Sequence, residues 1–580
     1  MILMQPELFI PLLLFIPLLG GLTLVLGPRL PESSVRSFTL GITLATFVIS
    51  MFVVKEYDWA ASASAQLLSR ASWVESFGLR FGFGLFDSVS LWLVLLTTFL
   101  MPLVVLGSWS AIGERVKEFH VWLLLLQAAM LGTFVATDIL FFYICFEFTL
   151  IPLYFLIGIF GSSQRLKAAR VFFLYTFTGS MLTFAGVLYV AWFNASLPAI
   201  SHFGAGVWTF DIATLIDAGR RMSSTEQCWV FLALLAGFAV KVPLWPVHTW
   251  LPLAHTEAPT AGSVVLAGVL LKLGTYGLYR LAIPMVPHAA VELAPVIAIL
   301  AIVGILYTAL VCWVQKDIKK LIAYSSVSHL GFCVLGLFAM NVAGTSGSVM
   351  YMVNHGLSTG ALFLCVGMIY ERLHTRAFDD FSGLGKVMPV WATFFVFFSL
   401  ASVGLPGLNG FVGEFLSILG AFQSTDVLGQ GSLSRSAVLA GIAGTGMILG
   451  AIYILYMVGR VVFGPLKMPG GGSHGGGGGH HHAAADLNVR EIVTLIPLAV
   501  ACVVLGVYPK LMLGSLEQPS RALVSYTKQM AKVSQDGVGA KMTLEGDQAE
   551  TMVKTGRLGE GAIAFSTRER IDTSVRTNDE

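Results

Sequence analysis

The stretch DILFFYICFEFTLIPLYFLIGIF (residues 138–160) decides the fold, because it is an apolar run as long as a membrane-spanning helix, with one carboxylate, Glu147, inside it. A helix that crosses the hydrocarbon core of a bilayer needs about 20 mostly apolar residues. Lipid offers the backbone no hydrogen-bond partners, so such a run predicts a helix that satisfies its own polar groups. A charge near the bilayer centre costs roughly 2.5–3.5 kcal/mol, which favours a functional role for Glu147.

Three more apolar runs carry a charge near their middle. Lys241 lies in CWVFLALLAGFAVKVPLWP, Lys272 in AGSVVLAGVLLKLGTYGLY and Glu414 in ASVGLPGLNGFVGEFLSILG. Burial penalises the charged form of a lysine and a nearby carboxylate favours it, so an acid and a lysine at this depth can act as a proton switch. We therefore predict that the four residues belong to a path that carries charge across a membrane. A buried structural ion-pair network is the alternative.

The composition agrees with a membrane protein and argues against other classes. The 580 residues are 56% hydrophobic and 12% charged, with a mean hydropathy of +0.79, whereas soluble domains carry about 25% charged residues. No basic patch indicates nucleic acid, and no glycine-rich nucleotide loop is present. The six cysteines show no CxxC spacing, so we expect apolar fillers rather than metal, haem or iron–sulfur ligands. The first apolar stretch, 8–27, lacks a basic leader and a cleavage site, which predicts a retained span.

We expect an all-α polytopic membrane protein, because no alternating barrel pattern appears. About fourteen runs are long enough to cross a bilayer: 8–27, 35–54, 84–108, 119–136, 138–160, 169–194, 228–250, 258–282, 291–313, 320–340, 346–370, 388–422, 436–464 and 491–513. The run 388–422 is too long for one straight crossing, and it contains four residues where it can break, namely Gly404, Pro406, Gly407 and Gly410.

Lys and Arg are distributed unevenly over the predicted loops. Loops after odd-numbered spans hold sixteen of them, and loops after even-numbered spans hold seven. Positive residues concentrate in the cytoplasmic loops of membrane proteins. We therefore predict that the loops after odd-numbered spans are cytoplasmic and that both termini face the outer, periplasmic side.

Spans 4–8 and 9–13 look like two copies of one five-helix unit. In each copy a charge stands beside a break in the fourth helix: Lys241 before Pro243 and Pro246, and Glu414 after Pro406. An odd number of crossings per unit inverts the second copy, and paired broken helices indicate a transport site. The predicted parts of the chain are helices 1–3 (1–118), the first repeat (119–282), the second, inverted repeat (291–464), a Gly/His-rich cytoplasmic loop (465–490), helix 14 (491–513) and a charged, largely disordered tail (514–580).

Two segments outside the predicted bundle have a distinctive composition. The glycine-rich stretch 468–486 contains four histidines that could bind a divalent metal, namely His474, His480, His481 and His482. We favour a flexible linker without a metal. The tail is charged and poor in aromatic residues, which predicts one amphipathic helix near 520–533 and disorder beyond it.

Histidines complete the candidate set. His329 in AYSSVSHLGF and His355 in YMVNHGLSTGALF lie in spans ten and eleven, beside serines and an asparagine. Imidazole accepts and passes protons near neutral pH, so we predict a wetted relay between the lysines and Glu414. A hydrogen-bonded core histidine is the alternative for each. His248, near the end of span seven, is a further candidate.

These residues lie in motifs that resemble a known family. The stretch KVPLWPVHTWLPLAHTEAPTAGSVVLAGVLLKLGTYGLYR (241–280), with KKLIAYSSVSHLGF and MVNHGLSTGALF, is similar to the signature of proton-translocating antiporter-like subunits, and the resemblance covers most of residues 80–465. Glutamate on the twelfth span, as in LPGLNGFVGEF, is similar to the M-type subunits of bacterial NADH:quinone oxidoreductase (complex I). The L- and N-type subunits and the multisubunit sodium/proton antiporters usually carry lysine there. The glycine–histidine insert and the long tail depart from the family pattern.

The resemblance implies a proton-translocating membrane subunit of an enzyme complex that oxidises NADH and reduces quinone. The roles that it implies are an input pair, Glu147 and Lys241, a central relay, Lys272, His329 and His355, and an output site, Glu414. No redox centre or cofactor is expected on this chain, while FMN, iron–sulfur clusters and quinone are implied on other subunits. The expected partners are the other membrane subunits, especially those of the L and N types, and the lipid of a bacterial inner membrane.

Two rival functions stay open. A subunit of a multisubunit cation/proton antiporter or of a membrane-bound hydrogenase would share nearly every motif, and co-purified flavin and iron–sulfur subunits would separate it from the first reading. A non-transporting membrane scaffold belongs to another class. It predicts that neutralising the buried charges leaves proton pumping intact.

Overall fold

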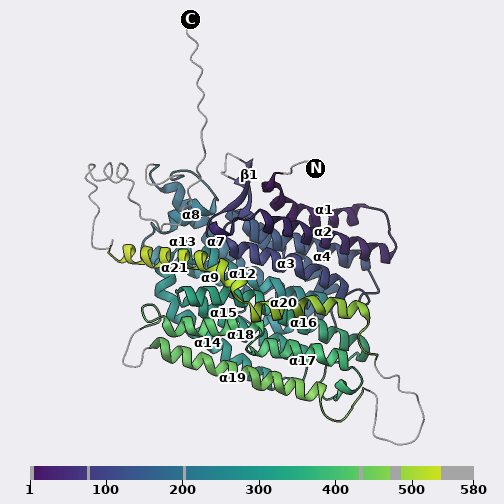
Figure 1. The fold of residues 1–580 in the computed structure, drawn as a ribbon. Coiled ribbons are helices and arrows are strands. Elements are labelled where there is room, and N and C mark those ends of the chain that lie inside the picture. Colours follow the sequence, from purple (N-terminus) through teal and green to yellow (C-terminus); the bar gives the residue numbers. More distant parts are fainter. Residues whose placement is uncertain (1–4, 75–78, 200–203, 430–434, 470–484, 537–580) are drawn as a thin grey trace, which may run out of the picture.

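The structure is a computed structural model that describes residues 5–74, 79–199, 204–429, 435–469 and 485–536. Its long helices run side by side, with α1 (Phe9–Leu26) and α2 (Glu32–Glu56) at one edge and α19 (Arg435–Val462) at the opposite edge (Figure 1). Among the described residues, twelve helices are long and apolar enough to cross a membrane. The predicted class of a helical, polytopic membrane protein is confirmed.

The other helices lie in or close to the predicted runs, apart from the short helix α8 (Ile212–Gly219), which lies in a segment predicted to be a loop. In the first half they are α3 (Ser88–Gly107), α4 (Val116–Val135), α5 (Ile139–Phe148), α6 (Leu150–Phe160), α7 (Arg165–Ser196), α8 (Ile212–Gly219), α9 (Ser224–Lys241) and α10 (Trp250–Glu257). In the second half they are α14 (Pro287–Trp313), α15 (Ile318–Phe338), α16 (Val342–Leu373), α17 (Pro389–Val403), α18 (Asn409–Gln423) and α20 (Val489–Val507). Short 3-10 turns are η1 (Pro6–Leu8), η2 (Trp59–Ala61) and η6 (Leu384–Lys386).

Two of the predicted spans are broken helices. The run 228–250 stops being helical after Lys241, and the chain turns over Pro243 and Pro246 before α10 begins. Proline lacks the backbone N–H that would continue the helix. The run 388–422 divides into α17 and α18 at Gly404, whose φ of +81° strains any residue with a side chain. The count of fourteen crossings, the inverted relation of the two repeats and the domain boundaries stay predictions.

The segment that carries Lys272 is an irregular helix. α11 (Thr260–Val265) passes into the π-helix η4 (Leu266–Leu270), then α12 (Leu271–Gly277), a second π-helix η5 (Leu278–Ala282) and α13 (Ile283–Met285). The most apolar part of this 26-residue run is completely buried. π-helical turns are rare and occur frequently at functional sites. An ordinary span was predicted here, because a π turn has no signature in composition.

The structure also contains a β-hairpin that the sequence analysis does not predict. Strands β1 (Gln66–Val74) and β2 (Leu79–Leu85) pair antiparallel, so the third helix begins at Ser88 rather than at the predicted residue 84. Gly82 has no room for a side chain, because a Cβ there would collide with Thr137 Oγ1. Thr137 N donates a hydrogen bond of 3.0 Å to Gly82 O, and this bond ties the hairpin to the turn after α4.

The helix predicted near 520–533 in the C-terminal tail is present, but its predicted extent is too short. α21 (Lys510–Asp536) is one continuous helix, where a helix was expected only near 520–533. It packs on α14 and α16, and Ser520 Oγ lies 2.9 Å from Ser346 Oγ of α16. The rest of the tail, 537–580, and the loop histidines lie outside the described residues, the latter being His474, His480, His481 and His482.

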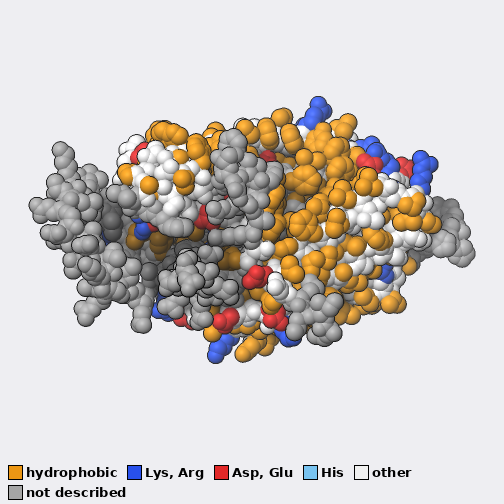
Figure 2. Space-filling view, turned by 90° about the horizontal axis from the view of Figure 1, so that it is seen from above, with side chains coloured by type: hydrophobic (Ala, Val, Ile, Leu, Met, Phe, Trp, Pro, Cys, Tyr) orange, Lys and Arg blue, Asp and Glu red, His pale blue; other side chains and the backbone are white. Residues whose placement is uncertain are grey.

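The visible surface suits a lipid environment. From above, hydrophobic side chains cover the middle of the face and charged ones lie mainly along its margins (Figure 2). Large apolar residues on the outside include Leu19 and Leu26 of α1 and Phe52 of α2. Exposed apolar patches of this extent mark membrane or partner surfaces.

Two basic residues that the sequence analysis counts with the loops lie inside the bundle. Arg280 belongs to η5 and forms an ion pair of 2.5 Å with Asp87, and Lys319 lies in the first turn of α15 with 6% of its surface exposed. Lys319 was counted with the loops predicted to be cytoplasmic and Arg280 with the loops on the other side of the membrane. Leaving both out therefore does not change which side carries more Lys and Arg.

Candidate functional site

The centre of the candidate site is a contact between two predicted residues, Lys272 and His355. Lys272 Nζ lies 2.7 Å from His355 Nδ1, and it also donates a hydrogen bond to Ala267 O. Lys272 is fully buried and His355 is 1% exposed. An ammonium group in this position can pass its proton to a neutral imidazole without contact with bulk water.

A close approach of two backbones places this pair. Gly268 of η4 faces Gly356 of α16, and a Cβ on Gly356 would lie only 2.7 Å from Gly268 O. Glycine at position 356 therefore lets α16 touch η4, whereas a Cβ on Gly268 would instead meet Leu100 Cδ1 at 2.7 Å. Because His355 precedes Gly356 in the chain, the same backbone contact places the imidazole of His355 next to Lys272.

A second contact joins Glu414 and His329. Glu414 Oε1 lies 3.0 Å from His329 Nδ1, and both residues are at most 4% exposed. Glu414 lies on α18, after the break that separates α17 from α18. Its carboxylate stands against Gly404 at that break, because a Cβ added to Gly404 would lie 2.8 Å from Glu414 Oε2. The ring centroids of His329 and His355 are 5.9 Å apart. The structure thus brings four predicted residues into one group: Lys272, His355, His329 and Glu414.

Two asparagine side chains hold the break against α16. Asn354 Nδ2 donates a hydrogen bond of 2.6 Å to Asn409 O, and Asn409 Nδ2 donates one of 3.1 Å to Asn354 O. Both residues are fully buried. These reciprocal bonds fix the start of α18, and with it Glu414, beside the helix that carries His355.

Tyr351 is a member of the site that the sequence analysis does not single out. Its hydroxyl lies 2.5 Å from His329 Nδ1 and donates a hydrogen bond to Glu414 Oε1. On the other side of the imidazole, His329 Nε2 faces Ser402 Oγ at 3.3 Å and the hydroxyl of Tyr453 at 3.5 Å. Tyr351 stands four residues before His355 on the same helix. This spacing places both side chains on one face of the helix, and it could have identified Tyr351 as a site residue from the sequence.

The predicted input pair is not in contact. Lys241 Nζ donates a hydrogen bond of 3.0 Å to Thr149 Oγ1 and lies 4.8 Å from the centre of the Phe146 ring. Among the described residues no ion pair joins Lys241 to Glu147, whose Oε1 is buried without a hydrogen-bond partner. Glu147 still lies within electrostatic reach of Lys241, so the structure shows these two residues without a direct ion pair, and their role as the input pair stays a prediction.

His248 lies in the turn between α9 and α10. It is 3% exposed, and its ring stands edge to face with Tyr307 at 6.0 Å. Its Nδ1 has no hydrogen-bond partner within the part of the chain that the structure describes. The structure does not bring it into contact with the other predicted residues.

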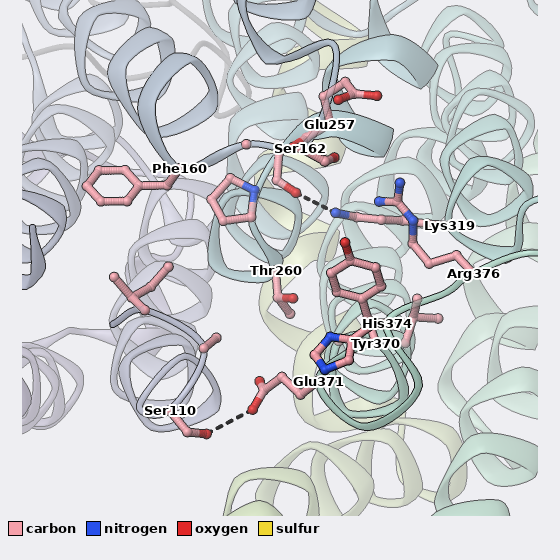
Figure 3. A pocket seen from close by; sticks show the side chains of 17 residues that line it. Ser110, Phe160, Ser162, Glu257, Thr260, Lys319, Tyr370, Glu371, His374 and Arg376 are labelled. Atoms are coloured by element: carbon pink, nitrogen blue, oxygen red, sulfur yellow. Dashed lines mark hydrogen bonds between the residues drawn. The ribbon is translucent and has the colours of Figure 1, made fainter. Parts of the chain in front are cut away.

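A cavity of about 510 Å³ opens at the end of the bundle predicted to be cytoplasmic. It is formed where five predicted cytoplasmic connections meet, after α3, α6, α10, α14 and α16. Ser110 donates to Glu371 at 2.8 Å on one side, and Lys319 and Arg376 lie on another (Figure 3). Lys319 Nζ donates to Ala258 O at 2.5 Å. This cavity could not be predicted from the sequence, because the residues that line it are far apart in the chain.

His255 lies next to this cavity and was also missed. It belongs to α10, two residues before Glu257, which lines the cavity. The ring is completely buried and stacks on Phe363 at 4.7 Å, and neither nitrogen has a hydrogen-bond partner among the described residues. It lies within electrostatic reach of both Lys319 and Lys272.

Further buried polar atoms, on helices α16, α17 and α18, also lack protein partners in the described part of the chain. They are His355 Nε2, Thr359 Oγ1, Ser399 Oγ, Asn354 Oδ1, Asn409 Oδ1 and Ser417 Oγ. Burying such an atom without a hydrogen bond costs about 1–3 kcal/mol, and ordered water normally supplies the missing partner. The arrangement is therefore suited to water-linked proton transfer.

The chain is similar to a known family of membrane proteins. The family model described as NADH:quinone oxidoreductase/Mrp antiporter, transmembrane, matches residues 136–440. NADH-quinone oxidoreductase subunit M of Rhodobacter capsulatus is 41% identical over 503 residues, which are 86% of this chain and 92% of that protein.

Solved structures give the same fold. A chain of respiratory complex I from Thermus thermophilus matches with a TM-score of 0.75 at 28% identity, covering 90% of this chain and all of that one. A chain of the Mrp complex from Dietzia sp. matches with a TM-score of 0.74 at 18% identity, covering 91% of this chain and all of that one. The second likeness is one of fold alone.

Proposed function

The chain belongs to the NADH:quinone oxidoreductase/Mrp antiporter family of membrane subunits, and we infer that it is the M-type proton-translocating subunit of NADH:quinone oxidoreductase (complex I). It works as one subunit of that enzyme, together with other membrane subunits of the complex. Electrons pass from NADH to quinone elsewhere, through FMN and iron–sulfur clusters held by other subunits. Its neighbours in the membrane are subunits of the L and N types.

The proton route runs through the buried groups. Glu147 and Lys241 control input, Lys272 and His355 pass the proton between the two halves, and the output group is formed by His329 and Glu414. In this structure Lys241 is held by Thr149 rather than by Glu147. An approaching carboxylate would stabilise the ammonium form of Lys241, and its departure would release the proton. Electrostatic changes that start at the quinone site drive this exchange.

The cavity lined by Lys319 and Glu257 is the cytoplasmic entrance of this route. His255 stands between the entrance and Lys272, with both nitrogens free of protein partners among the described residues. Waters that satisfy this ring would link it to the cavity. The orientation follows the positive-inside rule, with both termini on the periplasmic side of a bacterial inner membrane.

The observation that carries this function is the contact of Lys272 with His355, next to the contact of His329 with Glu414, all four residues being at most 4% exposed. Ionisable groups inside a membrane protein are costly and mark charge pathways by default. A scaffold would gain nothing from them. The 41% identity to a subunit M favours complex I over the antiporter rival, whose solved relative is 18% identical.

The direct test is purification of the whole complex through a tag on this chain. We expect flavin and iron–sulfur subunits to co-purify with NADH:quinone reductase activity, and the complex in proteoliposomes to pump protons. Membrane subunits alone with sodium/proton exchange would support the antiporter rival instead. Full pumping by an assembled Lys241→Met complex would support the scaffold.

A further inference from the structure

The output site contains a phenol that, within the described part of the chain, forms hydrogen bonds only with the two titratable groups already assigned there. Tyr351 is 2% exposed, and its hydroxyl contacts His329 Nδ1 at 2.5 Å and Glu414 Oε1. A buried hydroxyl is costly unless it is hydrogen-bonded, and a phenylalanine would fill the same space. The hydroxyl therefore has a role that packing does not explain.

The surroundings hold the ring in one place. Gly413 of α18 leaves room for it, because a Cβ there would lie 2.6 Å from Tyr351 Cβ. Phe332 and His329 both stand edge to face with the ring, at centroid distances of 6.4 Å and 5.9 Å. Helix α16, the break before α18 and α15 thus fix the hydroxyl between donor and acceptor, as proton transfer requires.

We propose that Tyr351 is a proton-conducting residue of the output site, whose hydroxyl links His329 to Glu414. This inference rests on the proposed function. In the transfer step, His329 Nδ1–H breaks as a new O–H bond forms on Tyr351 Oη. The original phenol O–H breaks as an O–H bond forms on Glu414 Oε1. The imidazolium becomes neutral imidazole, the carboxylate becomes a carboxylic acid, and the tyrosine stays a neutral phenol.

The direct distance of 3.0 Å between His329 Nδ1 and Glu414 Oε1 gives a parallel route, which the hydroxyl improves. The opposite ring nitrogen, His329 Nε2, faces Ser402 Oγ and the hydroxyl of Tyr453, so it can take up a proton as Nδ1 releases one. Proton movement across the imidazole then needs Nδ1 to hand its proton on. Tyr351 accepts it at the shorter of the two separations, 2.5 Å.

The test compares Tyr351→Phe with Tyr276→Phe in the intact complex in proteoliposomes. Tyr276 is a matched control: it is 1% exposed, its hydroxyl bonds to Ser90 Oγ at 2.8 Å and to Phe134 O at 3.3 Å, and the charged group beside it, Arg280, is not one of the residues of the proposed route. We expect Tyr351→Phe to lower the initial rate of proton translocation at least about tenfold with the complex assembled. Tyr276→Phe should pump at the wild-type rate.

A second variant separates proton conduction from positioning of Glu414. Replacing Tyr351 by 3-fluorotyrosine keeps the ring and the hydrogen bonds but makes the phenol more acidic. The titratable groups facing it are His329 and Cys333 on α15, Glu414 on α18, Tyr453 on α19 and His355 on its own helix. We expect the fluorinated protein to pump with a shifted pH profile. An unshifted profile beside a defective Tyr351→Phe would overturn the inference.

The outcome for Glu414→Gln tells the two failures apart. Normal pumping by Glu414→Gln would show that Glu414 does not carry the proton, and this result would refute the proposed route. Defective Glu414→Gln together with normal Tyr351→Phe refutes only the role of Tyr351.

Discussion

Lys272 Nζ and His355 Nδ1 lie 2.7 Å apart where η4 touches α16. The lysine belongs to the first predicted repeat and the histidine to the second, so this contact joins titratable groups of the two halves of the chain. It exists because Gly356 has no side chain and so lets the backbone of α16 approach Gly268 O. A proton on Lys272 can pass between the halves through this one contact.

Gly356→Ala should disrupt the junction. The added Cβ would lie 2.7 Å from Gly268 O and 2.9 Å from Leu96 Cδ2, so η4 and α16 must separate and carry Lys272 away from His355. We expect proton pumping per electron to fall severalfold in an assembled complex. Gly360→Ala is the control, since its Cβ would meet only Val264 Cγ1, at 3.7 Å. Equal pumping by the two variants would show that the close approach is irrelevant.

Glu147→Gln should nearly abolish pumping and leave assembly intact. The amide keeps the shape of the side chain but cannot stabilise the ammonium of Lys241, so the input switch is lost. The exposed Glu32, paired with Arg36 at 3.1 Å, offers Glu32→Gln as a control without effect. NADH-driven acidification of inverted vesicles gives the measurement. A full signal from assembled Glu147→Gln would remove this acid from the route.

The buried charges and the helix breaks could be predicted from the sequence. Apolar runs of bilayer length fixed the helical class, and single charges in them marked Glu147, Lys241, Lys272 and Glu414. Prolines after Lys241 and glycines before Glu414 marked the breaks, because both residue types disfavour a continuous helix. These signals are local, so they can be recognised from the sequence alone.

Features that depend on distant contacts could not be predicted. Thr149 holds Lys241 in place of the expected Glu147, and the partner of a buried lysine depends on packing between helices rather than on sequence spacing. The cavity at Lys319 needs five connections to converge. The helix of the tail was predicted only near 520–533, whereas α21 runs from Lys510 to Asp536 through Pro519. Tertiary contacts decided each case.

Asp87→Ala should destabilise the outer part of the first half. Asp87 pairs with Arg280 at 2.5 Å, accepts a hydrogen bond of 3.0 Å from the hydroxyl of Tyr279 and caps α3. Removing one partner of a buried ion pair costs about 3–5 kcal/mol. We expect a lower thermal transition or reduced assembly of the complex. Asp379→Ala, which breaks an exposed pair with Arg460, should cost at most about 1 kcal/mol. The account of the buried pair is wrong if both variants melt alike.

Deleting residues 470–482 should leave activity unchanged. The chain on both sides has its own anchors: Lys467 N donates to Ser382 O at 3.0 Å, and Asp486 accepts from Val390 N and Trp391 N. We expect normal NADH:quinone reductase activity and pumping, insensitive to chelators in the intact protein. Asp486→Ala is the contrasting variant, which should loosen the start of α17. A large loss on deletion, or a metal requirement, would refute the linker interpretation.

Lys272→Arg tests the central claim, that the proton itself passes through this residue, most directly. Arginine keeps the positive charge at about the same length but does not give up its proton. The measurement is the number of protons pumped per electron by the purified complex in proteoliposomes, with Lys55→Arg, an exchange at an exposed side chain, as the control. The account predicts an assembled Lys272→Arg complex that pumps far fewer protons per electron than the control. A wild-type ratio would contradict it, because a fixed positive charge would then be all that this position needs.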